Sequence, residues 1–292
     1  YFNPQVDYWR VPLMRDEEEI ERPADQYTVT RRYAEEAVAF IELHQHEPFF
    51  LYLPHTMPHM PLFRSGVFEG RSSAGVYGDV IEEIDWAVGE VMEVLDRLNL
   101  STRTLVVFTS DNGPWTSFET HGGSAGPLRH GKGTTFEGGM RVPGIFWWPD
   151  TIAPGVIRAI GSAMDLFTTA INIAGGRVPA NRPIDGLDLS PVLFDTGPSP
   201  RRMMAYYRMG ELYAFRLGSY KAHFVTEGRY GLPPDRSEHD PPLLFDLGVD
   251  PSERYNVAAE HPDALAAVVA AAEQYESSLT VAEPLFDLRG SP

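Results

Sequence analysis

A carboxylate and an amide stand side by side where an apolar run ends. Asp111 and Asn112 follow residues 105–108 (Leu-Val-Val-Phe), whose β-branched and aromatic types predict a short buried strand. Open α/β sheets hold their ligands in the crevice beyond the carboxyl ends of the strands. Carboxylate and amide oxygens suit Ca²⁺ or Mg²⁺, but Ca²⁺ takes about six to eight ligands, so we expect only part of a metal site here. On its own, the pair is equally typical of an Asx turn that closes the strand.

A glycine-dense segment that carries cations comes next. Seven glycines lie between residues 122 and 139, together with Arg129, His130 and Lys132. Such a backbone can approach a small anion closely, and the cations supply its counter-charge. Taken alone, the segment is more typical of a surface loop with scattered charges. Beside the Asp-Asn pair it favours a site for an oxyanion, with Lys132 as a compact point charge.

Two histidines follow a second apolar run. Residues 49–53 predict another buried strand, and His55 and His59 come after it among three prolines. An amphipathic helix over residues 79–98 would join this strand to the one at 105–108 as a βαβ unit, with both strand ends at one sheet edge. A loop histidine is usually only solvated or hydrogen bonded. At this edge, both histidines are candidates to face the crevice.

Three long segments resemble those of a known family. The words TSDNGP (109–114), LRHGKGTTFEGGMRVP (128–143) and PFFLYLPHTMPHMPLF (48–63) resemble the corresponding segments of the arylsulfatases, within the alkaline-phosphatase-like superfamily. The branch that they resemble most is that of arylsulfatase A and N-acetylgalactosamine-6-sulfatase. The likeness runs from about Tyr27 to the C-terminus. It implies a sulfuric-ester hydrolase that uses a divalent metal, Ca²⁺ with Mg²⁺ as a possible substitute.

The resemblance also implies roles for particular residues. His59 would contact the sulfate group, and Lys132 would bridge the sulfate and the leaving oxygen, so both are candidate catalytic and substrate-binding residues. Asp111 and Asn112 would be metal ligands. His239 falls where the family pattern brings a histidine toward the substrate pocket. Its equal alternative is a turn histidine between two acids.

The family's nucleophile has no counterpart in these residues. The resemblance implies a formylglycine made from Cys or Ser in a C/S-x-P-x-R segment, yet the chain has no cysteine and no such segment. The family's Asp-Asp metal pair is also missing, and the chain begins at Tyr1. We therefore interpret the chain as the C-terminal part of a longer protein and expect it to be inactive alone. The alternatives are a phosphomonoester or phosphonate-ester hydrolase of the same superfamily, or an inactive product that binds nothing.

The expected fold class is α/β, with an incomplete alkaline-phosphatase-like mixed sheet flanked by helices. A small C-terminal α+β domain follows, with an antiparallel sheet and a helix. The polar, proline-containing segment 197–202 marks the boundary, so we predict domains at 1–200 and 201–292. Further predicted elements are helices at 31–44, 165–174 and 262–277, a strand at 145–148, and meander strands at 203–207, 212–217, 220–225 and 243–247. Residues 1–26 read as an extended connection, and Lys221 and His223 as surface or interdomain residues.

Composition limits the partners. Hydrophobic residues make up 43% of the 292 residues, which is typical of a globular chain. A net charge of −17 argues against nucleic acid or an anionic membrane surface. A small-molecule or glycan sulfate ester is the expected partner, with no membrane span in this segment. The resemblance implies a periplasmic, extracellular or lysosomal location, and the absence of cysteine favours the bacterial periplasm.

Overall fold

The structure is a computed structural model that describes residues 10–280. The chain divides into two compact units. Unit 1 holds the described residues up to Phe108, with Phe118–Gly123 and Ile145–Ala153. Unit 2 holds Thr109–Ser117, Ser124–Gly144 and the described residues from Pro154 onward. Each unit has a hydrophobic core of its own.

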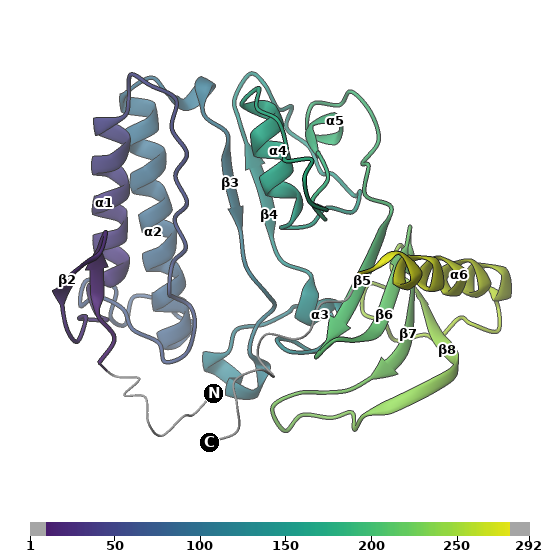
Figure 1. The fold of residues 1–292 in the computed structure, drawn as a ribbon. Coiled ribbons are helices and arrows are strands. Elements are labelled where there is room, and N and C mark those ends of the chain that lie inside the picture. The colour runs from purple at the N-terminus through teal and green to yellow at the C-terminus, as the bar shows by residue number, and fades with distance from the viewer. Residues whose placement is uncertain (1–9, 281–292) are drawn as a thin grey trace. The chain divides into compact units, whose positions relative to one another are not determined.

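Two packed helices form the body of unit 1 (Figure 1). α1 (Val29–Leu43) and α2 (Gly75–Arg97) each bury one apolar stripe, as the 3.6-residue spacing of their apolar residues requires. Ile41 of α1 meets Val94 and Leu95 of α2 in a cluster that is almost fully buried. The helix predicted at 31–44 is confirmed, and the one predicted at 79–98 begins four residues earlier.

Residues 49–53 do not form the predicted strand. The segment is extended, but it pairs with no strand within residues 10–280. Phe49 and Leu51 pack against the core of the helix pair, whereas Phe50 and Tyr52 are each 77% exposed. The alternation places one side-chain face on the helices and the other in solvent. The predicted βαβ unit is therefore wrong for the described chain.

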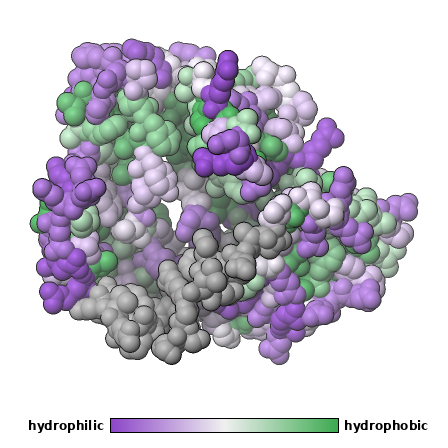
Figure 2. Space-filling model, viewed as in Figure 1, coloured by the Kyte–Doolittle hydropathy of each residue, from purple (hydrophilic) through white to green (hydrophobic). Residues whose placement is uncertain are grey.

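A short acidic hairpin lies near the start of unit 1. β1 (Leu13–Arg15) and β2 (Glu18–Glu21) pair antiparallel, so the prediction of an extended connection is wrong there. Residues 1–9 of that prediction lie outside the described residues. Figure 2 shows hydrophilic residues gathered over this hairpin. None of the helices in the described part of the chain is long and apolar enough to cross a membrane.

Short elements connect the larger ones. β3 (Val106–Thr109) and β4 (Gly144–Trp147) form a two-stranded sheet, and both confirm strands predicted from the sequence. The helix predicted at 165–174 is also confirmed. The other short elements are η1 (Ser101–Arg103), η2 (Thr116–His121), α3 (Glu137–Met140), α4 (Asp165–Ile173) and α5 (Ser190–Leu193).

A four-stranded antiparallel sheet forms the main part of unit 2. Its strands pair in chain order, and α6 lies across β6 and β7 (Figure 1). This arrangement confirms the predicted meander and its covering helix. The bounds are β5 (Met203–Arg208), β6 (Glu211–Leu217), β7 (Tyr220–Thr226), β8 (Ser237–Asp246) and α6 (Pro262–Ser278).

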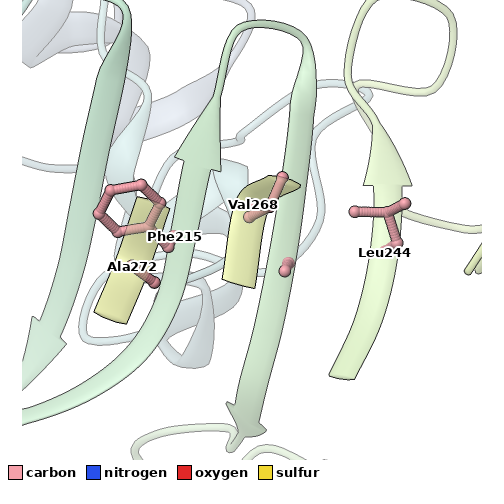
Figure 3. Close-up of a cluster of buried hydrophobic side chains, with 5 residues drawn as sticks. Phe215, Leu244, Val268 and Ala272 are labelled. Atoms are coloured by element: carbon pink, nitrogen blue, oxygen red, sulfur yellow. The ribbon is translucent and has the colours of Figure 1, made fainter. Parts of the chain in front are cut away.

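The two faces of this sheet differ in chemistry. Phe215, Ala222 and Leu244 share one face by the strand register, and they pack against Val268 and Ala272 of α6 (Figure 3). Neighbouring residues point to the opposite face because the side-chain period of a strand is two. That opposite face carries Arg216, Lys221 and Phe245, which are aligned across β6, β7 and β8. One face is therefore apolar, and the other presents charged side chains to the segment that covers it.

We predict that Phe215→Ala lowers the free energy of unfolding by about 3–5 kcal/mol, because a fully buried ring leaves a cavity under α6. Urea denaturation followed by circular dichroism measures the change. Val249→Ala is the control, since Val249 is 82% exposed, and it should change stability by less than about 0.5 kcal/mol. A loss below about 1 kcal/mol for Phe215→Ala would contradict this view of the core.

Candidate active site

The segments that carry Asp111 and Lys132 interlock through their backbones. The Gly113 N–H donates to the Gly139 carbonyl at 3.0 Å, and the Lys132 N–H donates to the Pro114 carbonyl at 2.8 Å. A Cβ on Gly113 would lie 1.8 Å from the Gly138 carbonyl oxygen, so only glycine permits this approach. The structure thus holds the backbone of Lys132 beside the Asp-Asn segment within unit 2. The roles of these side chains stay predictions.

The Asp111-Asn112 pair offers oxygens, but few of them. Asp111 is exposed, and the Asn112 side-chain amide donates to the Gly113 carbonyl at 2.8 Å. That bond uses the Asn112 nitrogen and orients its Oδ1 for another partner. Within residues 10–280 there is no group of three or more His, Cys, Asp or Glu side chains arranged to hold a metal ion. The donor type fits Ca²⁺ or Mg²⁺, and the donor number fits only part of a coordination shell.

Lys132 lies beside aromatic rings. Its Nζ is 4.7 Å from the centroid of the Trp115 ring, and the Trp115 and Tyr230 rings are 4.7 Å apart at an angle of 45°. Tyr230 belongs to the loop between β7 and β8, about 100 residues later in the chain. The C-terminal sheet therefore contributes a side chain to the surroundings of the candidate catalytic lysine.

Buried charges join the lysine-bearing segment to the charged face of the sheet. Lys221 of β7 is completely buried, and its Nζ donates to the Thr135 carbonyl at 2.7 Å and to Glu137 Oε1 at 2.9 Å. The same ammonium lies 3.1 Å from Glu253 Oε1. Glu253 Oε2 in turn accepts the Glu137 N–H at 2.6 Å. We call Lys221, Glu137 and Glu253 the buried charge triad.

His223 extends this cluster. Its Nε2 lies 2.7 Å from Glu253 Oε1, and its ring stacks on Phe136 with centroids 4.9 Å apart. Arg129 covers Phe136, with Cζ 4.3 Å from the ring centroid, and donates to the Glu253 carbonyl at 2.9 Å. The sequence-based prediction left a surface or an interdomain position open for Lys221 and His223. The surface alternative is wrong, because both are fully buried. The interdomain alternative stays open, since Lys221 contacts Thr135 and Glu137, on the other side of the predicted boundary at residue 200. Lys221 and His223 alternate with the apolar residues under α6 and so point to the opposite face.

The triad shifts the pKa values of its members. Burial alone would raise the pKa of Glu253, but the charge of Lys221, the hydrogen bond from His223 and the Glu137 N–H hold the pKa at about 2. Burial alone would lower the pKa of Lys221, yet the Glu253 and Glu137 carboxylates raise it above its ordinary value. Burial lowers the pKa of His223. The cluster therefore holds an ammonium, two carboxylates and a neutral imidazole.

The remaining candidate histidines lie in different surroundings. His59 belongs to unit 1, where its Nδ1–H donates to the Met60 carbonyl at 2.7 Å. His55 contacts the ring of Tyr33, and burial lowers its pKa. His239 lies on β8, with Nε2 2.8 Å from the Thr226 hydroxyl. The placement of His59 beside Lys132 stays a prediction.

Solved structures of sulfatases resemble this chain, and their fold is alkaline-phosphatase-like. The crystal structure of the PsFucS1 sulfatase from Pseudoalteromonas sp. matches with a TM-score of 0.79 and 26% identity, over 88% of this chain and 56% of that one. The sulfatase family model matches residues 3–176, and the model for the C-terminal region of aryl-sulfatase matches residues 199–290. The chain belongs to the sulfatase family.

Curated relatives agree with this membership. The chain is similar to bovine arylsulfatase A, with 44% identity over 244 residues, 77% of this chain and 48% of that protein. It is also similar to N-acetylgalactosamine-6-sulfatase of Sus scrofa, with 40% identity in an alignment 309 residues long that covers 94% of this chain and 59% of that protein. The chain spans about half the length of the curated relatives it matches. The expected family and fold class are confirmed.

Several residues of this site were missed by sequence reasoning. Trp115 and Tyr230 gave no signal, since neither belongs to a recognisable chemical pattern. Glu253 ends the sequence Asp-Pro-Ser-Glu (250–253), which is typical of a turn and gives no sign of a buried carboxylate. The available signal for the triad was the alternation of Lys221 and His223 with apolar residues on a strand.

We predict that stability falls with acid through Glu253. Its folded pKa of about 2 lies below the ordinary value of 4.5, so its contribution is complete above pH 4.5 and is lost as the pH falls from about 4.5 to 2. Between these pH values, the free energy of unfolding should drop by about 3 kcal/mol more in the wild type than in Glu253→Gln. Urea denaturation at several pH values measures the slopes.

The exposed Glu260→Gln is the matched control and should follow the wild-type curve. Parallel curves for the wild type and Glu253→Gln would show that the triad does not carry this pH dependence.

Proposed function

We propose that this chain is part of an enzyme that hydrolyses sulfate monoesters. The observation that carries the proposal is the interlocking of the Asp111-Asn112 segment with the glycine-dense segment that bears Lys132. It places hard oxygen donors and a lysine on adjacent backbones in a chain of the sulfatase family. Both curated relatives described above are sulfatases by name, which favours sulfate over phosphate esters.

Lys132 would bind the sulfate. A sulfate monoester spreads its charge over three oxygens, and hydrolysis moves further charge to the bridging oxygen. An ammonium has three N–H donors, so Lys132 can contact a sulfate oxygen and the leaving oxygen together. The stabilisation grows as the bond breaks, because the leaving oxygen gains charge.

Asp111 and Asn112 would hold part of a divalent metal site. Ca²⁺ is the first candidate and Mg²⁺ the second, because both prefer carboxylate and amide oxygens. The metal would supply positive charge at the sulfate oxygens, and a formylglycine outside these 292 residues would supply the nucleophile. The other metal ligands would also come from outside the described set.

Two histidines complete the proposal. Because the Nδ1–H of His59 donates to the Met60 carbonyl, the neutral ring carries its proton on Nδ1. In the imidazolium form, His59 would donate from Nε2 to the ester oxygen, with Lys132 as the second proton source. His239, oriented by the Thr226 hydroxyl, would contact the rest of the substrate.

The domain boundary and the location are also proposals. We place the catalytic part at 1–200 and the small C-terminal domain at 201–292, in line with the two family models, which match residues 3–176 and 199–290. A small-molecule or glycan sulfate ester would be the substrate. A periplasmic, extracellular or lysosomal location fits the family likeness, with the bacterial periplasm as the first candidate.

We predict that Lys132→Ala lowers the kcat for 4-nitrocatechol sulfate by about 100- to 1,000-fold, the usual cost of losing one donor to the developing charge. The assay uses a form of the protein that includes the proposed nucleophile segment. Lys132→Arg keeps the charge, so its kcat should fall less than that of Lys132→Ala. Arg158→Ala, at an exposed position, is the control and should keep the full rate. An unchanged rate in Lys132→Ala, with a lowered melting temperature, would overturn the role.

We predict little or no turnover for the 292-residue chain alone, because it lacks a nucleophile segment. The same 4-nitrocatechol assay tests this with the purified chain and added Ca²⁺. Substantial release of 4-nitrocatechol would mean that the nucleophile lies within these residues.

A further inference from the structure

Four cationic and aromatic side chains form a continuous row in unit 2. Lys132 Nζ lies 4.7 Å from the Trp115 ring centroid, and Trp115 contacts Tyr230 with centroids 4.7 Å apart. Arg229 Cζ lies 5.4 Å from the Tyr230 centroid. Lys132 and Trp115 come from the interlocked segments, whereas Tyr230 and Arg229 come from the β7–β8 loop. The row links the candidate catalytic lysine to the C-terminal sheet.

The loop that presents Tyr230 is tightly held. Tyr230 has a φ of +55°, a left-handed conformation that is rare for an aromatic residue. The Gly228 N–H donates to the Pro234 carbonyl at 2.7 Å, and Arg208 Nη1 donates to the Gly228 carbonyl at 3.2 Å. A Cβ on Gly228 would lie 2.0 Å from the Leu232 carbonyl oxygen. Strained residues persist where the surroundings impose them, and they cluster at functional sites.

The residue after Lys132 is shaped to admit this loop. Gly133 has a φ of +84°, and a Cβ there would lie 2.7 Å from Arg229 Cγ and 3.1 Å from Tyr230 Cε2. A side chain there would therefore require the Arg229 stem to move and Tyr230 to shift slightly. The two sides of the contact fit each other at the position next to the lysine.

We propose that Trp115 and Tyr230 are positioning residues that hold the Lys132 ammonium where the sulfate binds. The inference rests on the proposed function and deepens it, since it assigns to the C-terminal sheet a part in sulfate recognition. The face of an indole attracts an ammonium and leaves its N–H groups able to donate elsewhere. Lysine has a long flexible stem, so a fixed ring reduces the conformations that it samples. Tyr230 fixes that ring by contact.

The lysine content of the chain makes this testable. Lys132 and Lys221 are the only two lysines in the sequence, and Lys221 is completely buried. A chain labelled with ¹³C-lysine therefore gives two ε-methylene signals in an NMR spectrum, which Lys132→Arg assigns. The Trp115 ring current should shift the Lys132 signal, and the Lys221 signal reports that the fold is intact. Titration with sodium sulfate then gives the affinity at Lys132.

We expect Tyr230→Leu to move the Lys132 signal toward its random-coil position and to weaken sulfate binding about 3- to 10-fold, the range for loss of an ordered cation–π contact. Tyr230→Phe should keep the wild-type position of the Lys132 signal and the wild-type sulfate affinity, because the contact uses the ring and not the hydroxyl. Tyr255→Leu, at a tyrosine that is 69% exposed, is the matched control and should behave as the wild type. If Tyr230→Leu also displaces the Lys221 signal, the fold itself has changed. Trp115→Leu then serves as the second test variant.

The outcomes separate the two proposals. An unchanged Lys132 signal and unchanged sulfate affinity in Tyr230→Leu and Trp115→Leu would overturn the positioning role. Suppose instead that both variants move the Lys132 signal, but that sulfate does not move this signal in the wild type. That result would support the positioning of the lysine and count against the proposed function.

Discussion

The buried charge triad is the interaction on which the arrangement of unit 2 depends. A buried charge is costly unless it is paired and hydrogen bonded. Lys221 satisfies its ammonium with Thr135, Glu137 and Glu253, so each partner must stay in place for the others to remain buried. The lysine-bearing segment consequently has to close over the charged face of the sheet. The apolar face is free to pack against α6, which supplies the hydrophobic core.

The glycines of the candidate site follow from this closure. Because the triad draws residues 135–137 onto the sheet, the backbone on either side has to pass close to the Asp-Asn segment. Gly138 would place a Cβ 2.3 Å from the Arg129 carbonyl oxygen, and Gly131 would place one 2.2 Å from the Pro114 carbonyl oxygen. The glycines therefore allow the backbone segments to pack closely, in addition to any role in binding an anion.

Local pattern predicted the periodic elements well and the long-range contacts poorly. α1, α6 and the meander were predictable because their apolar spacing, turn residues and proline position act locally. Residues 49–53 were misjudged since an apolar run cannot reveal whether a partner strand lies beside it. Asp111, Asn112 and Lys132 were predicted from neighbouring segments of sequence, and their roles stay predictions. Glu253 and Tyr230 were missed because each contacts a residue far away in the sequence, Glu253 at Glu137 and Tyr230 at Trp115, and only folding brings these residues together.

Hydrogen exchange in Lys221→Met tests the central claim most directly. The amides of Lys132 and Gly138 donate to the Pro114 and Arg129 carbonyls, and those of Phe215 and Ala222 lie in the core ladder under α6. Without the buried ammonium, we expect the two loop amides to exchange at least about ten times faster relative to the core amides. Equal acceleration of loop and core amides, or no change in either, would contradict the account that the triad holds the lysine-bearing segment on the sheet.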